Sequence, residues 1–264
     1  MLCKKLHCVE SVYTGLVSMG FSAKEEAFVV VFAALYYVFS LVSPFVPAVG
    51  LPEIKIHLEA FLASVFGILL GARLGALTAL VGALVAWILP PGNASVYGAP
   101  FLLSPPLNAF VSGLVYERRW KEAVGVMAFL IGVFWFTLPV TPFSQYWYVG
   151  LAVTFDKIIA LALIMPAAVL LNRRRGLFVA FFLLAFVGNQ TDNMWGALVF
   201  AFPVVYSGVF GLNVEVVRFL FTVSPFVYPA IRLVQALLAA VVAVPLVRAL
   251  RGAGWLPLGR KCED

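Results

Sequence analysis

One long apolar stretch, His57 to Pro91, constrains the fold of this 264-residue chain more than any other segment. Beyond its first residue it contains one acidic residue, one arginine and otherwise apolar or small side chains. A single helix of this length would run for about 50 Å, whereas the hydrocarbon core of a bilayer is only ~30 Å thick. Gly67, Gly71 and Gly75 recur every four residues, and Arg73 lies between the last two. We therefore predict a membrane helical hairpin that bends at Gly71–Arg73 and packs its arms through small residues.

The composition of the whole chain is that of a membrane protein. Hydrophobic residues make up 63% of it and charged residues only 11%, against about 25% charged residues in soluble proteins. We expect one all-α domain, a polytopic transmembrane helical bundle of residues 27–250, between an N-terminal tail (1–26) and a C-terminal tail (251–264). The predicted location is the cell membrane, with several passes through the lipid.

Apolar runs and breaking residues predict about eight spans. They cover residues 27–49, 58 to the bend at 71–73, 73–89, 101–116, 123–138, 147–171, 176–187 and 228–250. Ser22 and Glu25 form a candidate capping box before the first span. Residues 195–209 are apolar but contain glycine and proline, and we interpret them as a re-entrant or surface segment. The alternative is a further hairpin with residues 214–227.

The basic residues predict an orientation. All but four lie in the tails or in short turns that this topology places on one side: Lys4, Lys5, Lys24, Arg73, Arg118, Arg119, Lys121, Arg173, Arg174, Arg175, Arg248, Arg251, Arg260 and Lys261. The positive-inside rule makes that side cytoplasmic, and both termini with it. The net charge of +6 therefore reflects topology, and we expect no nucleic-acid partner.

The remaining charges cluster toward the outer side and predict a solute site. The four remaining cations are Lys55, Lys157, Arg218 and Arg232, and Glu53, Glu59, Asp156, Asp192, Glu215 and His57 accompany them. Ionisable groups at membrane depth persist when they pair or line a wet cavity. Asp156 and Lys157 are sequence neighbours, which diverge on a helix, so we expect separate partners and pair Asp156 with Arg232. The alternative role for that pair is purely structural.

A polar run beside a tryptophan adds further candidates. Residues 189–193 (Asn-Gln-Thr-Asp-Asn) precede Trp195 in a chain that is otherwise poor in hydrogen-bonding side chains. This pattern suits a small polar ring ligand, although an ordinary exposed loop is the alternative. The predicted solute-binding residues are Glu53, His57, Glu59, Asp156, Lys157, Asn189, Asp192, Asn193, Trp195 and Arg232.

Motifs for chemistry are missing from the sequence. It contains no His-Glu-x-x-His, no Gly-x-Ser-x-Gly and no phosphate-binding lysine loop. Cys3, His7 and Cys8 lie close together but lack a fourth zinc ligand. We expect neither an enzyme nor a metal or other cofactor.

Several segments resemble the substrate-binding S components of energy-coupling factor (ECF) transporters. The matching segments are residues 32–36 (Phe-Ala-Ala-Leu-Tyr), the glycine turn of residues 66–75, residues 108–119, and residues 224–232 with Pro245-Leu246. The resemblance implies a six-helix core, to which residues 123–171 would add an extra hairpin.

The resemblance also implies a function. S components capture a vitamin or similar small solute from outside, and a transmembrane coupling subunit with two cytoplasmic ATPases energises its delivery. It implies docking of the coupling subunit at Ala33 and Ala34, and a lid over the site in the loop that contains Glu53 and His57. One alternative is a self-sufficient proton-coupled secondary transporter, in which Asp156 and Lys157 would relay protons, or a lipid-handling protein. A membrane enzyme and a structural scaffold are the remaining alternatives.

Overall fold

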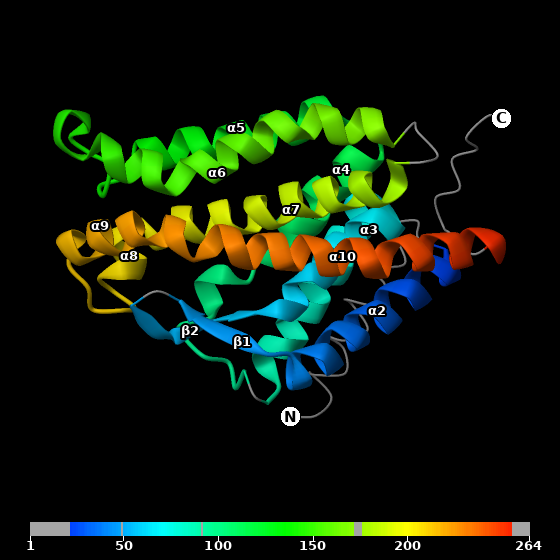
Figure 1. Cartoon of the computed structure of the whole chain (residues 1–264). Helices are drawn as coiled ribbons and strands as arrows, with labels where there is room; N and C mark the ends of the chain where they lie inside the picture. Colours follow the sequence, from blue (N-terminus) through cyan, green and yellow to red (C-terminus); the bar gives the residue numbers. More distant parts are fainter. Residues whose placement is uncertain (1–21, 49, 91, 172–175, 255–264) are drawn as a thin grey trace.

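The computed structural model describes residues 22–48, 50–90, 92–171 and 176–254, apart from the side chains of residues 53–55. Within this part the chain forms nine α-helices and one two-stranded β-hairpin (Figure 1). The helices are α2 (Ala23–Val42), α3 (Phe61–Ile88), α4 (Ser104–Tyr116), α5 (Trp120–Trp135), α6 (Phe143–Leu170), α7 (Leu177–Phe200), α8 (Pro203–Tyr206), α9 (Val214–Val223) and α10 (Tyr228–Gly252). The strands are β1 (Phe45–Ala48) and β2 (Leu51–His57), and short 3₁₀ turns cover Leu58–Ala60, Ala99–Phe101 and Ser224–Phe226.

Among the described residues, four helical segments are long and apolar enough to cross a membrane, which indicates a multi-pass membrane protein. They are Ala23–Val42, Leu58–Ile88, Phe143–Leu170 and Tyr228–Gly252. The prediction of about eight spans is therefore wrong. At 13 and 16 residues, α4 and α5 rise only about 20 and 24 Å, short of a ~30 Å hydrocarbon core. Helix α7 is also long enough, but its buried polar run keeps it out of this group.

The predicted bend in the long apolar stretch is present at Gly71. This residue has φ 82° and ψ −179° and interrupts α3. A Cβ placed on Gly75 would lie 2.8 Å from the Cα of Gly67, although residues eight apart in an unbroken helix are separated by roughly 12 Å. The two arms of α3 therefore fold back and pack against each other through glycine. Leu58–Ile88 is long enough for a span only when its two arms are counted together, because each arm alone is shorter than the hydrocarbon core.

Replacing Gly71 with alanine tests this bend. Its backbone conformation lies in a region that only glycine enters readily, so we expect Gly71→Ala to lower the free energy of unfolding by about 1–3 kcal/mol. Gly132→Ala is the control, because Gly132 lies within α5 and nothing lies within 4 Å of its added Cβ. Thermal unfolding of both variants in the same detergent measures the difference. Equal stability would mean that the bend is absent.

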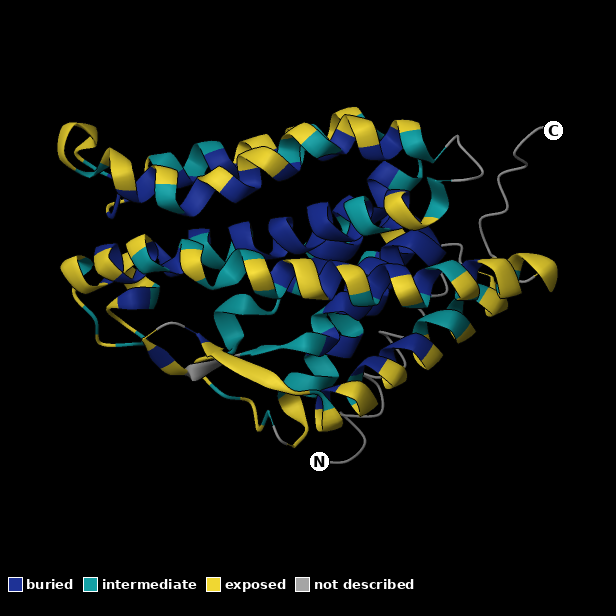
Figure 2. Ribbon diagram, viewed as in Figure 1, coloured by how far each residue is buried: buried dark blue, intermediate teal, exposed yellow. Residues whose placement is uncertain are grey.

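Helix α7 forms the centre of the bundle. It packs against α3, α4, α5, α6 and α10, and Figure 2 shows it buried while the outward faces of α2, α5, α6 and α10 are exposed. The polar run 189–193 is part of this helix and is fully or almost fully buried. The interpretation of residues 195–209 as one re-entrant or surface segment holds only for the later part, where residues 202–204, 207 and 208 are exposed, and the alternative membrane hairpin with 214–227 is wrong because α8 and α9 are too short to span. Residues 195–200 complete α7, and the two short helices α8 and α9 follow.

Basic side chains gather at one end of the bundle, which we call the basic end: the bend of α3, the turn between α4 and α5, and the C-terminal end of α10. The amide of Ala72 donates a hydrogen bond to Glu117 Oε1 at 2.9 Å, and Arg251 donates to the hydroxyl of Tyr116 at 2.8 Å. Lys24, at the start of α2, reaches the carbonyl of Gly254 at 3.2 Å. The described parts of both chain ends therefore lie together at the basic end.

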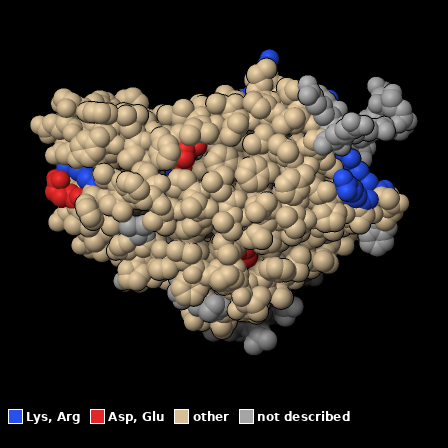
Figure 3. Space-filling view, in the orientation of Figure 1, with Lys and Arg blue, Asp and Glu red and all other residues tan. Residues whose placement is uncertain are grey.

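The lateral surface is largely uncharged. In Figure 3, Lys and Arg atoms gather near the C-terminal end of α10 and a mixed group lies at the opposite end, while the face between them carries two small acidic spots and a few basic atoms at its upper edge. Large apolar side chains are exposed on several helices, for example Val42 on α2 and Phe129 on α5. Such a band suits contact with lipid. At the basic end, the hydrogen bond from Arg119, together with the charges of Arg119 and Arg73, holds the pKa of Glu122 below its ordinary value.

The loop predicted after the first span is a β-hairpin. Phe45 pairs with His57 and Pro47 with Lys55, and Gly50 makes the turn with φ 70°. Ser22 and Glu25 form the predicted capping box at the start of α2. The hairpin lies in the same half of the molecule as α8 and α9, away from the basic end (Figure 1).

Arg218 joins α9 to the turn between α5 and α6. Its guanidinium donates to the carbonyls of Pro139, Leu138 and Thr141 at 3.0–3.2 Å and stacks 3.4 Å from the centroid of the Tyr146 ring. Arg218 also pairs with Glu215, whose side chain is 67% exposed. We expect Arg218→Ala to lower the free energy of unfolding by about 2–4 kcal/mol, because charged hydrogen bonds to three carbonyls are lost.

Glu215→Ala separates the two contributions of Arg218. An exposed ion pair contributes at most about 1 kcal/mol, so this variant should unfold close to the wild-type temperature. If Glu215→Ala is as damaging as Arg218→Ala, the ion pair stabilises this corner and the carbonyl contacts do not.

Candidate functional site

A cavity of about 260 Å³ lies beneath the β-hairpin, at the end of the bundle away from the basic end. At ~30 Å³ per water, it has room for about nine water molecules or one small solute. Its lining comes from α2, both strands, α4, α6, α7, α9, α10 and the 3₁₀ turns: Tyr36, Ala48, Leu51, Ile56, His57, Glu59, Ala60, Phe101, Ser104, Pro105, Val153, Lys157, Asp192, Asn193, Gly196, Ala197, Phe200, Leu220, Phe221, Ser224, Tyr228 and Arg232.

An ion pair crosses the middle of the cavity wall. Arg232 Nη1 on α10 lies 3.1 Å from Asp192 Oδ2 on α7, and each residue is 7% exposed. The same nitrogen donates to Gln235 Oε1 at 2.9 Å, and Gln235 Nε2 donates to the carbonyl of His57 at 3.0 Å. A continuous polar connection therefore runs from α7 through α10 to the end of β2.

Two predictions about charge pairing are wrong. Arg232 pairs with Asp192 and not with Asp156, and Asp156 pairs with its sequence neighbour, since Lys157 Nζ lies 2.9 Å from Asp156 Oδ1. Neighbouring side chains diverge on a helix, but the long lysine stem can bend back when burial leaves it no other acid. The geometry is poor, because neither carboxylate oxygen of Asp156 accepts a hydrogen bond within the described residues.

Glu59 and His57 lie at another side of the cavity. The Oε1 atom of Glu59 is 3.3 Å from His57 Nδ1, and the backbone amide of Glu59 donates to Ser43 Oγ at 3.0 Å. The residue is 4% exposed, and its Oε2 atom has no hydrogen-bond partner in the part of the chain that the structure describes. A buried oxygen of this kind needs a donor from whatever occupies the cavity.

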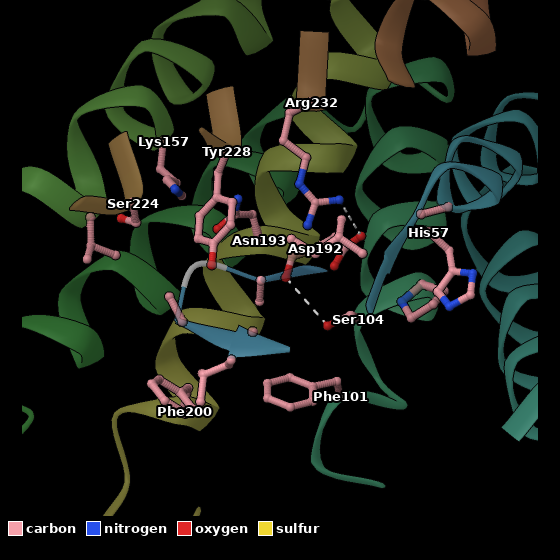
Figure 4. A pocket seen from close by; sticks show the side chains of 18 of the residues that line it. His57, Phe101, Ser104, Lys157, Asp192, Asn193, Phe200, Ser224, Tyr228 and Arg232 are labelled. Atoms are coloured by element: carbon pink, nitrogen blue, oxygen red, sulfur yellow. Dashed lines mark hydrogen bonds and ion pairs between the residues drawn. The ribbon is translucent and has the colours of Figure 1, made fainter. Parts of the chain in front are cut away.

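Aromatic rings form the apolar part of the wall. Figure 4 shows Phe101, Phe200 and Tyr228 around the cavity, with Lys157, Asn193 and Arg232 reaching in from α6, α7 and α10. Ser104 donates to the carbonyl of Asp192 at 3.5 Å and joins α4 to α7 at the cavity wall. Rings together with a few convergent polar groups are the usual composition of a small-molecule site.

Most of the predicted site residues line this cavity: His57, Glu59, Lys157, Asp192, Asn193 and Arg232. Asp156, Asn189 and Trp195 do not. Asp156 lies behind Lys157 and forms an ion pair with it. Asn189 accepts a hydrogen bond from Asn108 at 2.9 Å within the core. Trp195 Nε1 has no hydrogen-bond acceptor among the described residues. The side chain of Glu53 lies outside the described part of the chain.

A buried polar layer next to the cavity was not predicted. Asn108 on α4 donates to Asn189 Oδ1 and to the carbonyl of Ala60, and Ser64 on α3 donates to Asn108 Oδ1 at 2.7 Å. Ser104, Asn108 and Ser112 recur every four residues, a spacing that places polar side chains on one face of α4. That spacing could have revealed the layer. Tyr36, Phe101 and Tyr228 carry no such signal beyond their aromatic character.

The two predicted docking residues differ in accessibility. Ala33 is 3% exposed and faces the chain's own core, whereas Ala34 is exposed on α2. In this conformation only Ala34 is accessible to a partner subunit. No group of three or more His, Cys, Asp or Glu side chains suited to a metal ion occurs in the part of the chain that the structure describes.

No known protein family, curated protein or solved structure matches this chain.

Proposed function

We propose that this protein is a membrane-embedded subunit that captures a small polar solute, a vitamin or a compound of similar size, for uptake into the cell. One observation carries the proposal: a partly open cavity joins charged, amide and aromatic side chains from distant parts of the chain. Ionisable groups at membrane depth typically mark a solute or ion pathway. A purely structural role would not require a cavity of about 260 Å³ beside them.

The position of the cavity supports capture from outside the cell. Arg232 lies one turn from the start of α10, whose other end carries Arg251 at the basic end. If the basic end is cytoplasmic, as the positive-inside rule proposes, the cavity faces the outside and both termini lie inside. The β-hairpin would then cover the site as a lid. Its last residue contributes to the wall, and its backbone is tied to α10 through Gln235.

Energy for delivery would come from other proteins. The resemblance to ECF transporter S components supports a transmembrane coupling subunit and two ATPases as partners, with the exposed face of α2 around Ala34 as the docking surface. Affinity purification of the tagged full chain from its own membranes tests this point. A transmembrane subunit and ATPases should co-purify, and an Ala34→Trp variant should lose them while retaining the solute.

Solute capture itself is tested on the purified full chain. High-resolution mass spectrometry of the denatured protein should find a small molecule enriched over a cavity-filling variant, Gly196→Leu. A Cβ at Gly196 meets nothing closer than 3.8 Å, so the larger side chain can extend into the cavity without displacing backbone. Gly132→Leu is the matched control on an open face of α5. If wild type and Gly196→Leu release the same compounds in the same amounts, the proposal is wrong.

A self-sufficient proton-coupled transporter is the second candidate, and the buried Asp156–Lys157 pair favours it. Each of these residues is 3% exposed, on a helix long enough to span the membrane. Proteoliposomes that contain only this chain distinguish the two functions. Solute flux that follows an imposed pH gradient, and that Asp156→Asn abolishes, would support the second candidate.

A further inference from the structure

The charged groups of the cavity are separated along its length. Lys157 lies at one side in Figure 4 and His57, which is in contact with Glu59, at the other, with Arg232 and Asp192 between them. The central pair is mutually neutralised. Lys157 is also ion-paired, with Asp156 at 2.9 Å, but Asp156 does not line the cavity. The ammonium of Lys157 at one end and the carboxyl group of Glu59 at the other, acidic end are therefore the groups that face a solute.

One carboxyl oxygen at the acidic end lacks a donor. Glu59 Oε2 is buried in the cavity wall without a hydrogen-bond partner in the described residues. Leaving a buried carboxylate oxygen unpaired is costly, and a protonated nitrogen or an N–H group supplies what it lacks.

The ammonium group of Lys157 has more N–H donors than one partner can accept. The ammonium of Lys157 carries three N–H bonds, and its only ion-pair partner in the described part of the chain is Asp156, in a geometry that gives the carboxylate no regular hydrogen bond. Lys157 itself lines the cavity, whereas Asp156 does not. An anionic group of a solute can therefore contact Lys157 while Asp156 remains behind it.

We infer that the solute is an amphoteric molecule with a flat ring, held with its anionic group toward Lys157 and a protonated nitrogen or N–H donor toward Glu59. This inference rests on the proposed function. The formal charges of the wall residues Glu59, Lys157, Asp192 and Arg232 cancel, and Asp156 behind Lys157 adds one negative charge, so the site has no net positive charge that would favour a purely anionic solute. Phe101, Phe200 and Tyr228 provide flat apolar contacts for the ring between the two ends.

The test begins with the compound that the purified full chain releases on denaturation. A compound that carries both a carboxylate or phosphate and a basic nitrogen supports the inference. A compound with only one of these groups, or with neither, overturns the inference and leaves solute capture intact. If nothing is enriched over Gly196→Leu, the proposed function fails and the inference fails with it.

Two variants then test the two ends. Glu59→Gln removes the acid, and the double change Asp156→Asn with Lys157→Met removes the lysine without leaving its buried carboxylate charged. Each should reduce the amount of the retained compound at least about tenfold, because a charge-assisted hydrogen bond is lost. The matched surface changes Glu122→Gln and Lys121→Met lie on the exposed start of α5 and should leave retention within about twofold.

Gel filtration and thermal unfolding establish that the cavity variants are folded. Wild-type retention in both folded cavity variants would overturn the assignment of Glu59 and Lys157, even if the released compound is amphoteric. If only one of the two variants loses the retained compound, the proposed contact of the solute with both Lys157 and Glu59 is wrong.

Discussion

Replacing Gly67 with alanine should lower the free energy of unfolding by about 3 kcal/mol or more, because the new methyl group would collide with backbone. Its Cβ would lie 2.2 Å from the carbonyl oxygen of Ala109 and 2.9 Å from the amide nitrogen of Gly113. These atoms belong to α4, so the helix would have to move away from α3. Gly113→Ala should act in the same way, since its Cβ would lie 2.4 Å from the amide nitrogen of Ala72.

Helix association inside a membrane explains the size of this effect. Lipid chains are as apolar as side chains, so close backbone packing through small residues must hold the helices together. Gly67 and Gly113 provide that packing between α3 and α4, and the cavity residues Glu59 and Ser104 lie in the turn that precedes α3 and at the start of α4. Loss of the packing should therefore weaken solute retention as well as stability.

Gly125→Ala and Gly132→Ala provide the matched controls. Both glycines lie within α5, and nothing lies within 4 Å of an added Cβ at either position. Alanine favours a helix over glycine by about 1 kcal/mol, so these variants should be as stable as wild type or slightly more stable. If Gly67→Ala unfolds at the same temperature as Gly132→Ala, the packing of α3 on α4 is not as described.

Breaking the Asp192–Arg232 pair should have the second large effect. Asp192→Ala leaves the Arg232 guanidinium buried without its acid, and we expect a loss of about 3–5 kcal/mol in stability. Solute retention should also be lost, because both residues belong to the cavity wall. Unfolding temperature and the amount of released compound measure the two consequences separately.

The double variant Asp192→Asn with Arg232→Gln separates binding from stability. It removes both charges and keeps hydrogen-bonding side chains, so most of the lost stability should return. Solute retention should remain absent. The exposed pair Arg119–Glu122 is the matched control, and removing it should change stability by no more than about 1 kcal/mol. Retention of the solute by the folded double variant would exclude the ion pair from the site.

The sequence predicted those features that depend on local chemistry. The capping box at Ser22 and the bend at Gly71 follow from neighbouring residues, and both are present. Sorting the charges also brought Asp192 and Arg232 into one candidate site, although 40 positions separate them. The reason is general: charge is so costly in a membrane that the few buried ionisable groups tend to meet.

The features that the sequence did not reveal depend on tertiary contacts. Polarity suggested that α7 ends before Asn189, but Asn108 on a neighbouring helix donates a hydrogen bond to Asn189 Oδ1 and the helix continues. The predicted pairing of Asp156 with Arg232 was wrong because equal depth in the membrane does not determine which sides of two helices contact each other. The apolar runs overestimated the number of spans, since folded arms and short helices can be as apolar as a full span.

An experimental density map of the full chain, purified from its own membranes without added solute, tests the central claim most directly. The cavity should contain density for a flat small molecule between Phe101 and Tyr228, with one end at Lys157 and the other at Glu59. A cavity filled only with ordered water or a lipid chain, in protein that remains folded, would contradict the proposed capture of a polar solute.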